Sequence, residues 1–175
     1  MLHYYKNLIF CIALLMASLQ AGAQIRHVQG INAIDAGVGI SKYGTAYTAG
    51  YTQYFSRKVY GKAMLNHEIA KHPDDDFQVK RMFLDIAGFY TLADWNEIMF
   101  FNIGLGVSTS IEGFHQIESP PVDNTFKIGA IAGFEVETFI SDRWVWLLGG
   151  NYRYMTKEAF GNTRYYLTTG IRFNL

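Results

Sequence analysis

The segment from Arg143 to Met155, RWVWLLGGNYRYM, alternates between two kinds of residue. In an extended chain, one face would carry Trp144, Trp146, Leu148, Gly150, Tyr152 and Tyr154, and the other Val145, Leu147, Gly149, Asn151 and Arg153. The first face is aliphatic or small in the middle and aromatic at both ends. Trp and Tyr gather at the two headgroup levels of a membrane, so this order is typical of a lipid-facing strand. We therefore predict a transmembrane β-strand here, with an aromatic girdle formed by Trp144, Trp146, Tyr152, Tyr154 and Phe173.

The same alternation recurs along the chain after Gly30, where no run of 18 apolar residues occurs. It predicts eight strands: Gly30–Ile40, Gly44–Phe55, Lys58–Ala70, Phe77–Ala93, Glu97–Gly113, Phe126–Ile140, Arg143–Thr156 and Asn162–Leu175. Tight connections near 56–57, 94–96 and 142 alternate with longer ones at 71–76 and 112–125, although the first connection, near 41–44, is short. Short turns on one rim and longer loops on the other are typical of outer-membrane barrels. The expected fold is all-β: an eight-stranded antiparallel transmembrane β-barrel of the outer-membrane type.

A soluble, lipocalin-like barrel is the alternative, because alternation alone does not say which face points outward. Three features favour the membrane barrel. Aromatic residues lie at the strand ends on the apolar face, and small and charged residues share the other face. In addition, an eight-stranded barrel has too narrow an interior for two large apolar walls.

Five acids and five bases fall on the inward face and form the predicted lumen charge cluster. They are Asp35, Glu68, Asp85, Glu135, Glu137, Lys62, Arg81, Lys127, Arg153 and Arg172. An unpaired buried charge costs several kcal/mol, so these groups are expected to pair with one another. The cluster is interpreted as a structural plug of salt bridges, and an ion pathway is the alternative.

The composition agrees with a protein whose surface only partly faces water. Charged residues make up 17% of the 175 residues, against about 25% in soluble domains. Fifteen basic and fifteen acidic residues give a net charge of zero, so no positive field attracts nucleic acid. No direct nucleic-acid binding is expected, and outer-membrane lipid is the expected environment.

The N-terminal residues have the three parts of a signal peptide. Lys6 precedes an apolar run from Leu8 to Leu19, and small residues follow at Ala21 and Ala23. We predict cleavage between Ala23 and Gln24, so that 1–23 is a signal peptide for Sec-dependent export and 24–175 a single barrel domain in the outer membrane of a Gram-negative bacterium. An uncleaved N-terminal membrane anchor is the alternative, but the apolar run is too short to span a bilayer.

No constellation of residues points to catalysis, to a metal or to another cofactor. The only cysteine, Cys11, lies in the predicted signal peptide. A Ser/His/acid set of His67, Ser110 and Glu112 can be drawn, but it falls on the third and fifth predicted strands, which are not neighbours. The segment HEIAKHPDDD, at 67–76, is rich in ligand types but has neither zinc-protease nor calcium-loop spacing. The protein is not expected to be an enzyme.

The C-terminal third resembles the TraO-type conjugal transfer protein family of Bacteroidetes conjugative transposons. The resemblance is carried by E-T-F-I-S-D-R-W at Glu137–Trp144 and by G-I-R-F-N at Gly170–Asn174, with Q-G-I at Gln29–Ile31 as a weaker element. It covers about Thr125 to Leu175 well and the rest only in general character.

This resemblance implies an outer-membrane component of a conjugative DNA-transfer apparatus, with other proteins of that apparatus as partners and no catalytic residues. Since the chain is neutral and its lumen is expected to be plugged, a structural or docking role is expected rather than conduction of DNA. A general small outer-membrane barrel of structural or adhesin type is the alternative, and a lipid-modifying barrel enzyme is a third reading. The sequence does not indicate the oligomeric state.

Overall fold

The structure, a computed structural model, describes residues 29–41, 43–71, 78–115, 126–156 and 163–175. The predicted signal peptide and its cleavage site lie outside these residues, as do parts of four connections. Eight strands are present: β1 (Asn32–Ser41), β2 (Gly44–Tyr54), β3 (Val59–Lys71), β4 (Gln78–Trp95), β5 (Met99–His115), β6 (Phe126–Phe139), β7 (Trp144–Met155) and β8 (Thr163–Asn174). The described residues contain no helix of the length and apolar character needed to cross a membrane.

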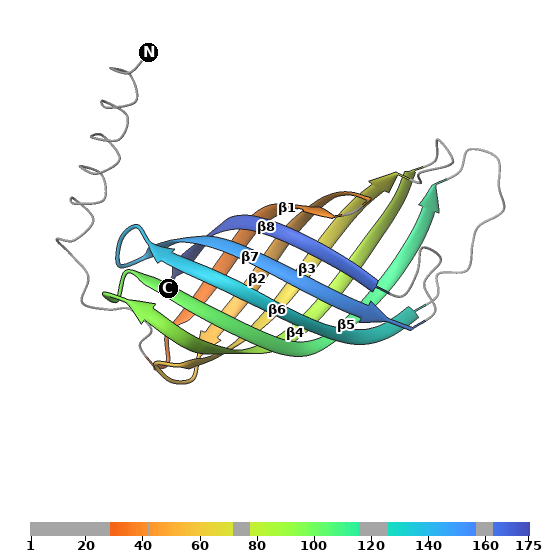
Figure 1. Ribbon diagram of the computed structural model, residues 1–175. Coiled ribbons are helices and arrows are strands. Elements are labelled where there is room, and N and C mark those ends of the chain that lie inside the picture. Colours follow the sequence, from red (N-terminus) through yellow and green to blue (C-terminus); the bar gives the residue numbers. More distant parts are fainter. Residues whose placement is uncertain (1–28, 42, 72–77, 116–125, 157–162) are drawn as a thin grey trace, which may run out of the picture.

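The strands follow one another in chain order around a closed barrel (Figure 1). Every neighbouring pair is antiparallel, and β1 closes the barrel against β8 in a register that runs from Ala33–Asn174 to Ser41–Tyr166. Closure leaves no strand edge unpaired in the membrane, where a free backbone N–H or C=O costs several kcal/mol. The predicted eight-stranded antiparallel barrel is therefore confirmed, with strand ends within a few residues of those expected.

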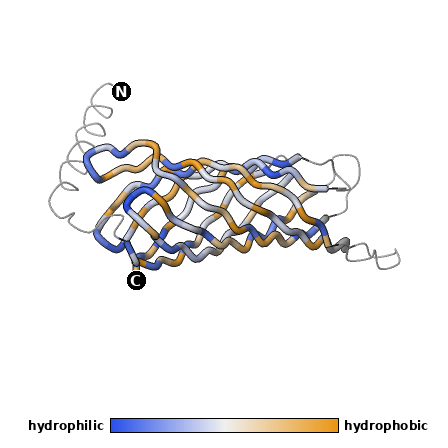
Figure 2. Tube along the Cα trace, turned by 90° about the horizontal axis from the view of Figure 1, so that it is seen from below, coloured by the Kyte–Doolittle hydropathy of each residue, from blue (hydrophilic) through white to orange (hydrophobic). Residues whose placement is uncertain are grey.

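The buried charged side chains point into the barrel together with buried aromatic and aliphatic groups, whereas the outer face of the strands is mainly apolar. Hydrophobic and hydrophilic residues alternate along the strands (Figure 2). The outward Leu105 is 73% exposed, whereas the inward Arg172 is fully buried. A soluble barrel would have the reverse arrangement, so the lipocalin-like alternative is wrong.

The apolar band has the height of a membrane. Trp144 and Tyr154 mark the two ends of the outward face of β7, ten residues apart. At about 3.3 Å per residue and a strand tilt of about 40°, this separation corresponds to about 25 Å along the barrel axis. Outer-membrane barrels have an apolar band of about this height.

The two rims of the barrel differ. The β2–β3, β4–β5 and β6–β7 turns lie on the rim where β1 begins and β8 ends. A serine hydroxyl organises two of these turns: Ser56 Oγ accepts from the Val59 amide at 3.1 Å, and Ser141 Oγ from the Trp144 amide at 3.1 Å. Since short turns of outer-membrane barrels face the periplasm, we call this the periplasmic rim and the opposite one the extracellular rim.

The β4–β5 turn has an unusual backbone. Asn96 and Glu97 have φ values of 52° and 57°, and the Ile98 amide donates to the Trp95 carbonyl at 3.0 Å. Two consecutive positive φ values define a type I′ hairpin turn, which favours Asn followed by Gly. Glu97 occupies the glycine position, and its carboxylate pairs with the exposed Arg57 on the neighbouring turn.

We expect glycine at position 97 to stabilise the barrel. Because the pair with Arg57 would otherwise confuse the result, the comparison is between R57A and R57A/E97G. Relief of the left-handed conformation should raise the free energy of unfolding by about 0.5–1 kcal/mol, measured by urea titration in lipid vesicles. A lower free energy of unfolding in R57A/E97G would show that the turn is not under strain.

Candidate functional site

The lumen is the candidate functional site because it contains most of the buried charge of the described chain. Buried ionisable side chains reach it from β3, β4, β6, β7 and β8, and Asp35 joins them from β1. They separate into two groups along the barrel axis. We call the group nearer the periplasmic rim the lower layer (Asp35, Lys62, Glu135, Glu137 and Arg172) and the group nearer the extracellular rim the upper layer (Glu68, Arg81, Asp85, Arg153 and Arg164).

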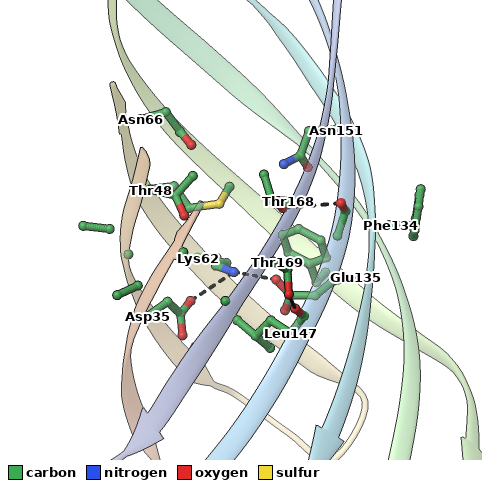
Figure 3. A pocket seen from close by; sticks show the side chains of 18 residues that line it. Asp35, Thr48, Lys62, Asn66, Phe134, Glu135, Leu147, Asn151, Thr168 and Thr169 are labelled. Carbon is green, nitrogen blue, oxygen red and sulfur yellow. Dashed lines mark hydrogen bonds and ion pairs between the residues drawn. The ribbon is translucent and has the colours of Figure 1, made fainter. Parts of the chain in front are cut away.

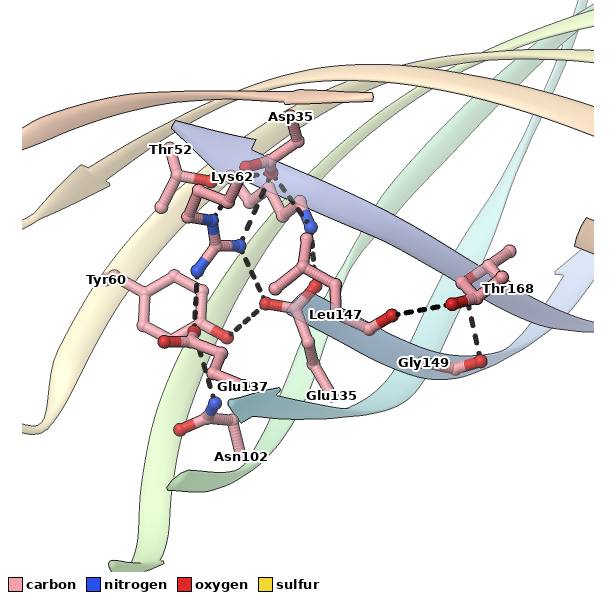
Figure 4. Close-up of polar contacts among 12 residues, drawn as sticks. Asp35, Thr52, Tyr60, Lys62, Asn102, Glu135, Glu137, Leu147, Gly149 and Thr168 are labelled. Carbon is pink, nitrogen blue, oxygen red and sulfur yellow. Dashed lines mark hydrogen bonds and ion pairs between the residues drawn. The ribbon is translucent and has the colours of Figure 1, made fainter. Parts of the chain in front are cut away.

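Arg172 is the centre of the lower layer, and the four other members of the layer are labelled in Figure 4. Its Nε donates to Asp35 Oδ1 at 2.6 Å. Its Nη1 donates to Glu137 Oε1 at 2.6 Å and its Nη2 to Glu135 Oε1 at 2.7 Å. One guanidinium from β8 thus binds carboxylates from β1 and β6 and uses all three of its nitrogens. Bonds of this kind are shorter and stronger than neutral hydrogen bonds.

Lys62 completes the charge pairing of the lower layer from β3. Its Nζ lies 3.0 Å from Asp35 Oδ2 and also pairs with Glu135. Asp35 and Glu135 are therefore each shared between two cations. Three acids face two bases, and all five side chains are almost completely buried.

Tyrosines supply further hydrogen bonds to the lower layer, in addition to those that Thr52 donates to Asp35 and Asn102 to Glu137. Tyr54 accepts from Arg172 Nη1 at 2.7 Å and donates to Glu137 at 3.1 Å. Tyr60 donates to Glu135 at 2.9 Å, and its ring stacks on Phe89 with centroids 5.0 Å apart. Both tyrosine rings lie within 5.8 Å of the Arg172 guanidinium carbon, close enough for a cation–π contribution.

The upper layer repeats this design around Arg153. Its guanidinium pairs with Asp85 on β4 and lies 4.9 Å from the centroid of Phe83 and 4.3 Å from that of Tyr166. Asp85 also accepts hydrogen bonds from Asn66 at 2.7 Å and from Ser108 at 2.5 Å. The carboxylate is thereby held by β3, β5 and β7 at once.

Glu68 is the second anion of the upper layer and is completely buried. Arg81 and Arg164 approach its Oε2 to 3.5 and 3.4 Å. Tyr166 donates to the same oxygen at 3.0 Å, and Ser41 donates to Oε1 at 2.5 Å. The Glu68 carboxylate therefore joins β1, β4 and β8 to β3 near the extracellular rim.

A small cavity lies between the two layers (Figure 3). Its volume is about 30 Å³. Polar groups of Thr48, Asn66, Asn151 and Thr168 line it, with Lys62 on its periplasmic side. Inward glycines, including Gly37, Gly149 and Gly170, leave this space open. A polar cavity of this size has room for about one or two water molecules.

The structure places the predicted lumen residues as follows. All except Lys127 are buried and lie in one of the two layers, and Lys127 is half-buried near the extracellular end of β6. The prediction omitted Arg164, which is 2% exposed and pairs with Glu68. The alternation of inward and outward residues does predict an inward Arg164, because Arg164 is an even number of residues before Tyr166 and Arg172, which both point inward. The prediction also omitted the lumen tyrosines, because aromatic residues were attributed to the lipid face.

The Ser/His/acid set drawn from the sequence is not assembled. Ser110 is buried on the lumen side of β5, whereas His67 is on the outer face of β3, between the inward Asn66 and Glu68. The wall of the barrel separates them. The side chain of Glu112 is outside the described part of the chain. Within that part, no three His, Cys, Asp or Glu residues are grouped so that they could hold a metal ion.

The predicted girdle residues lie at two levels on the outer face. Trp144, Trp146 and Phe173 are near the periplasmic rim, where the rings of Trp144 and Phe173 are 4.8 Å apart. Tyr152 and Tyr154 are near the extracellular rim and about half exposed. Trp146 Nε1 donates to Thr169 Oγ1 at 2.9 Å. Both polar groups therefore have a hydrogen-bond partner in the hydrocarbon region of the membrane.

Comparison with known proteins shows the fold. No family model and no curated protein matches the sequence. Among solved structures, Neisserial surface protein A matches with a TM-score of 0.64 at 15% identity, covering 83% of this chain and 96% of that one. Ail, the attachment invasion locus protein of Yersinia pestis, matches with a TM-score of 0.59 at 12% identity over 85% and 100% of the two chains.

A third similar structure is the outer membrane enzyme PagL, with a TM-score of 0.52 at 9% identity, covering 81% of this chain and 98% of that one. The chain therefore has the fold of the eight-stranded barrels of Gram-negative outer membranes. At these identities the likeness concerns the fold alone, and one such fold supports unrelated functions.

Removal of Arg172 should destabilise the barrel strongly. In R172M, three buried carboxylates would share the single ammonium of Lys62. Since breaking a buried ion pair typically costs about 3–5 kcal/mol, the free energy of unfolding should fall by about this amount. It can be measured by urea titration in lipid vesicles, with the gel mobility of the unheated protein reporting the folded fraction.

Two variants serve as controls for R172M. R57A removes an exposed pair whose side chains are 63% and 52% exposed, and it should change stability by less than about 1 kcal/mol. R172M/E137Q removes one of the stranded charges and should recover part of the loss. A loss in R172M no larger than that in R57A would contradict the role given to the lower layer.

Proposed function

We propose that this chain is a non-catalytic outer-membrane barrel with a closed lumen, which serves a conjugative DNA-transfer apparatus as a structural or docking component. The observation that carries the closed lumen is the pair of charged layers. Each layer crosses the barrel interior, and the cavity between them is too small for a hydrated ion. On this proposal, function lies in the rims and the outer wall rather than in transport.

The link to conjugation rests on the resemblance to the TraO-type family. The two segments that carry it meet in space. Glu137 of the first segment accepts from Arg172 of the second at 2.6 Å, and the Asn174 amide donates to the Arg143 carbonyl at 2.8 Å. The two resembling segments thus form one structural unit on the periplasmic side of the barrel. Their contact supports relatedness to the family more strongly than two motifs far apart in the structure would.

Export completes the proposal. Signal cleavage after Ala23 would release the chain into the periplasm, and assembly would place the short turns on the periplasmic side. The periplasmic rim would then be accessible to envelope-spanning proteins of the apparatus. The extracellular rim would face a recipient cell.

A closed lumen predicts no ion conduction. The purified full chain in a planar lipid bilayer should give no stepwise current at either polarity, because no continuous water path crosses the two layers. Protein unfolded by boiling, added at the same concentration, controls for leakage caused by aggregates. Reproducible unitary conductance steps from folded protein would overturn the closed-lumen part of the proposal.

A role in conjugation predicts loss of transfer when the gene is deleted. Mating frequency should fall by at least tenfold with normal growth, and a plasmid copy of the intact chain should restore it. The same plasmid without the gene is the control. Unchanged mating frequency in the deletion strain would exclude the conjugative role.

A general small outer-membrane barrel of structural or adhesin type is the second candidate. It is favoured by the fold, since Neisserial surface protein A and the attachment protein Ail are similar along most of their lengths. Normal transfer combined with reduced attachment to surfaces or cells in the deletion strain would support it. A lipid-modifying activity is favoured by no described group of residues, and an altered lipid profile in the deletion strain would be needed to revive it.

A further inference from the structure

The lipid-facing wall has several hollows, two of which adjoin β1, and another crosses β6, β7 and β8. This last hollow has a volume of about 490 Å³. Gly150 lies between Phe134 on β6 and Leu167 on β8 in register, and the Phe134 ring lies over it. The next row towards the extracellular rim consists of Ala132, Tyr152 and Tyr165. We call this feature the β7 groove.

The groove exists because two outward positions carry almost no side chain. Gly150 has none and Ala132 has a single methyl group. The Phe134 ring lies against the Gly150 backbone, so that a Cβ added at Gly150 would be 2.3 Å from Phe134 Cε1. The ring covers Gly150, which is buried, so the hollow lies over Ala132, and the half-exposed Phe134 and Leu167 border it.

The position of the groove in the membrane identifies what fills it. Gly150 is four residues above Trp146 and two below Tyr152 on the outward face of β7. This places the groove between the two aromatic levels, in the half of the hydrocarbon that is nearer the extracellular rim. No charged side chain lines it. Its surroundings are hydrocarbon, so its occupant must be apolar.

We propose that the β7 groove holds one acyl chain of an outer-leaflet lipid in a fixed position. The chain would lie over Ala132, beside the Phe134 ring and Leu167. Tyr152 and Tyr165, which face each other in register, would place their hydroxyls at the headgroup level, where they can donate hydrogen bonds to ester or phosphate oxygens. This site is independent of any role in conjugation.

The outer wall at β4 and β5 has a different surface. Leu84, Ile86 and Leu105 project outward there and are 49%, 57% and 73% exposed. Branched side chains that project in this way offer a lipid only a convex surface. A lipid chain would contact them transiently, as it contacts any apolar wall.

Photolabelling distinguishes a fixed chain from bulk lipid. The full chain is reconstituted in phosphatidylcholine vesicles that contain a small fraction of phosphatidylcholine with a diazirine in the middle of one acyl chain. After irradiation, adducts are mapped by mass spectrometry of peptides. We expect several-fold more adducts on Phe134 and Leu167 than on Leu84 and Leu105.

Filling the groove should abolish this preference. A132L places an isobutyl group in the groove and should reduce labelling there to the level of β4 and β5. A63L is the matched control, because Ala63 is a half-buried alanine on the outer face of β3, outside the groove. Gel mobility confirms that each variant is folded, and G150A, which would displace the Phe134 ring into the groove, replaces A132L if that variant does not fold.

Two results would overturn the proposal. Even labelling of all lipid-facing strands in the wild type would mean that the groove holds no fixed chain, as expected if it were reserved for a membrane-protein partner. Retention of the enrichment in A132L would mean that the adducts do not arise from a chain in the groove.

Discussion

The structure depends on the pairing of charges in a barrel interior that excludes bulk water. A carboxylate or guanidinium in such a place is tolerated only when opposite charge and hydrogen bonds replace its hydration. Arg172 meets this requirement by binding Asp35, Glu135 and Glu137 from two other strands. The same contacts fix how far each strand is shifted against its neighbours. A one-residue slip of β8 would turn Arg172 towards lipid and leave three acids behind.

Much of the fold could be predicted from the sequence because a membrane barrel imposes a period of two on every strand. The alternation from Trp144 to Tyr154 predicts the strand, its outward face and the height of the apolar band. The predicted strand ends at the β4–β5 turn are less accurate. Asn96 and Glu97 have positive φ values, which the sequence Asn-Glu does not predict because the second position of such a turn favours glycine. The register shift between Thr91 and Ala93 likewise has no sequence signal.

The lumen could be predicted as a set of residues but not as a set of contacts. Alternation indicates that Arg153 and Asp85 point inward, yet they are 68 residues apart and on strands that are not neighbours. The pairing of acids with bases depends on how far each strand is shifted against its neighbours around the whole barrel. This shift is determined only when the barrel closes. Arg164, Tyr54 and Tyr60 are absent from the predicted set, and Tyr166, which alternation places on the same face of its strand as Arg172, is given no role there. In the structure, aromatic rings fill the space beside each central arginine.

The lower layer also has a consequence for the order of assembly. Asp35 belongs to the first strand, Glu135 and Glu137 to the sixth, and Arg172 to the last. Until β8 is in place, three carboxylates have only the Lys62 ammonium between them, so every intermediate that lacks the final strand carries uncompensated negative charge. Barrel closure and charge neutralisation are one event. A barrel that lacks β8 would therefore be less stable in a bilayer than one in which the lower layer is complete.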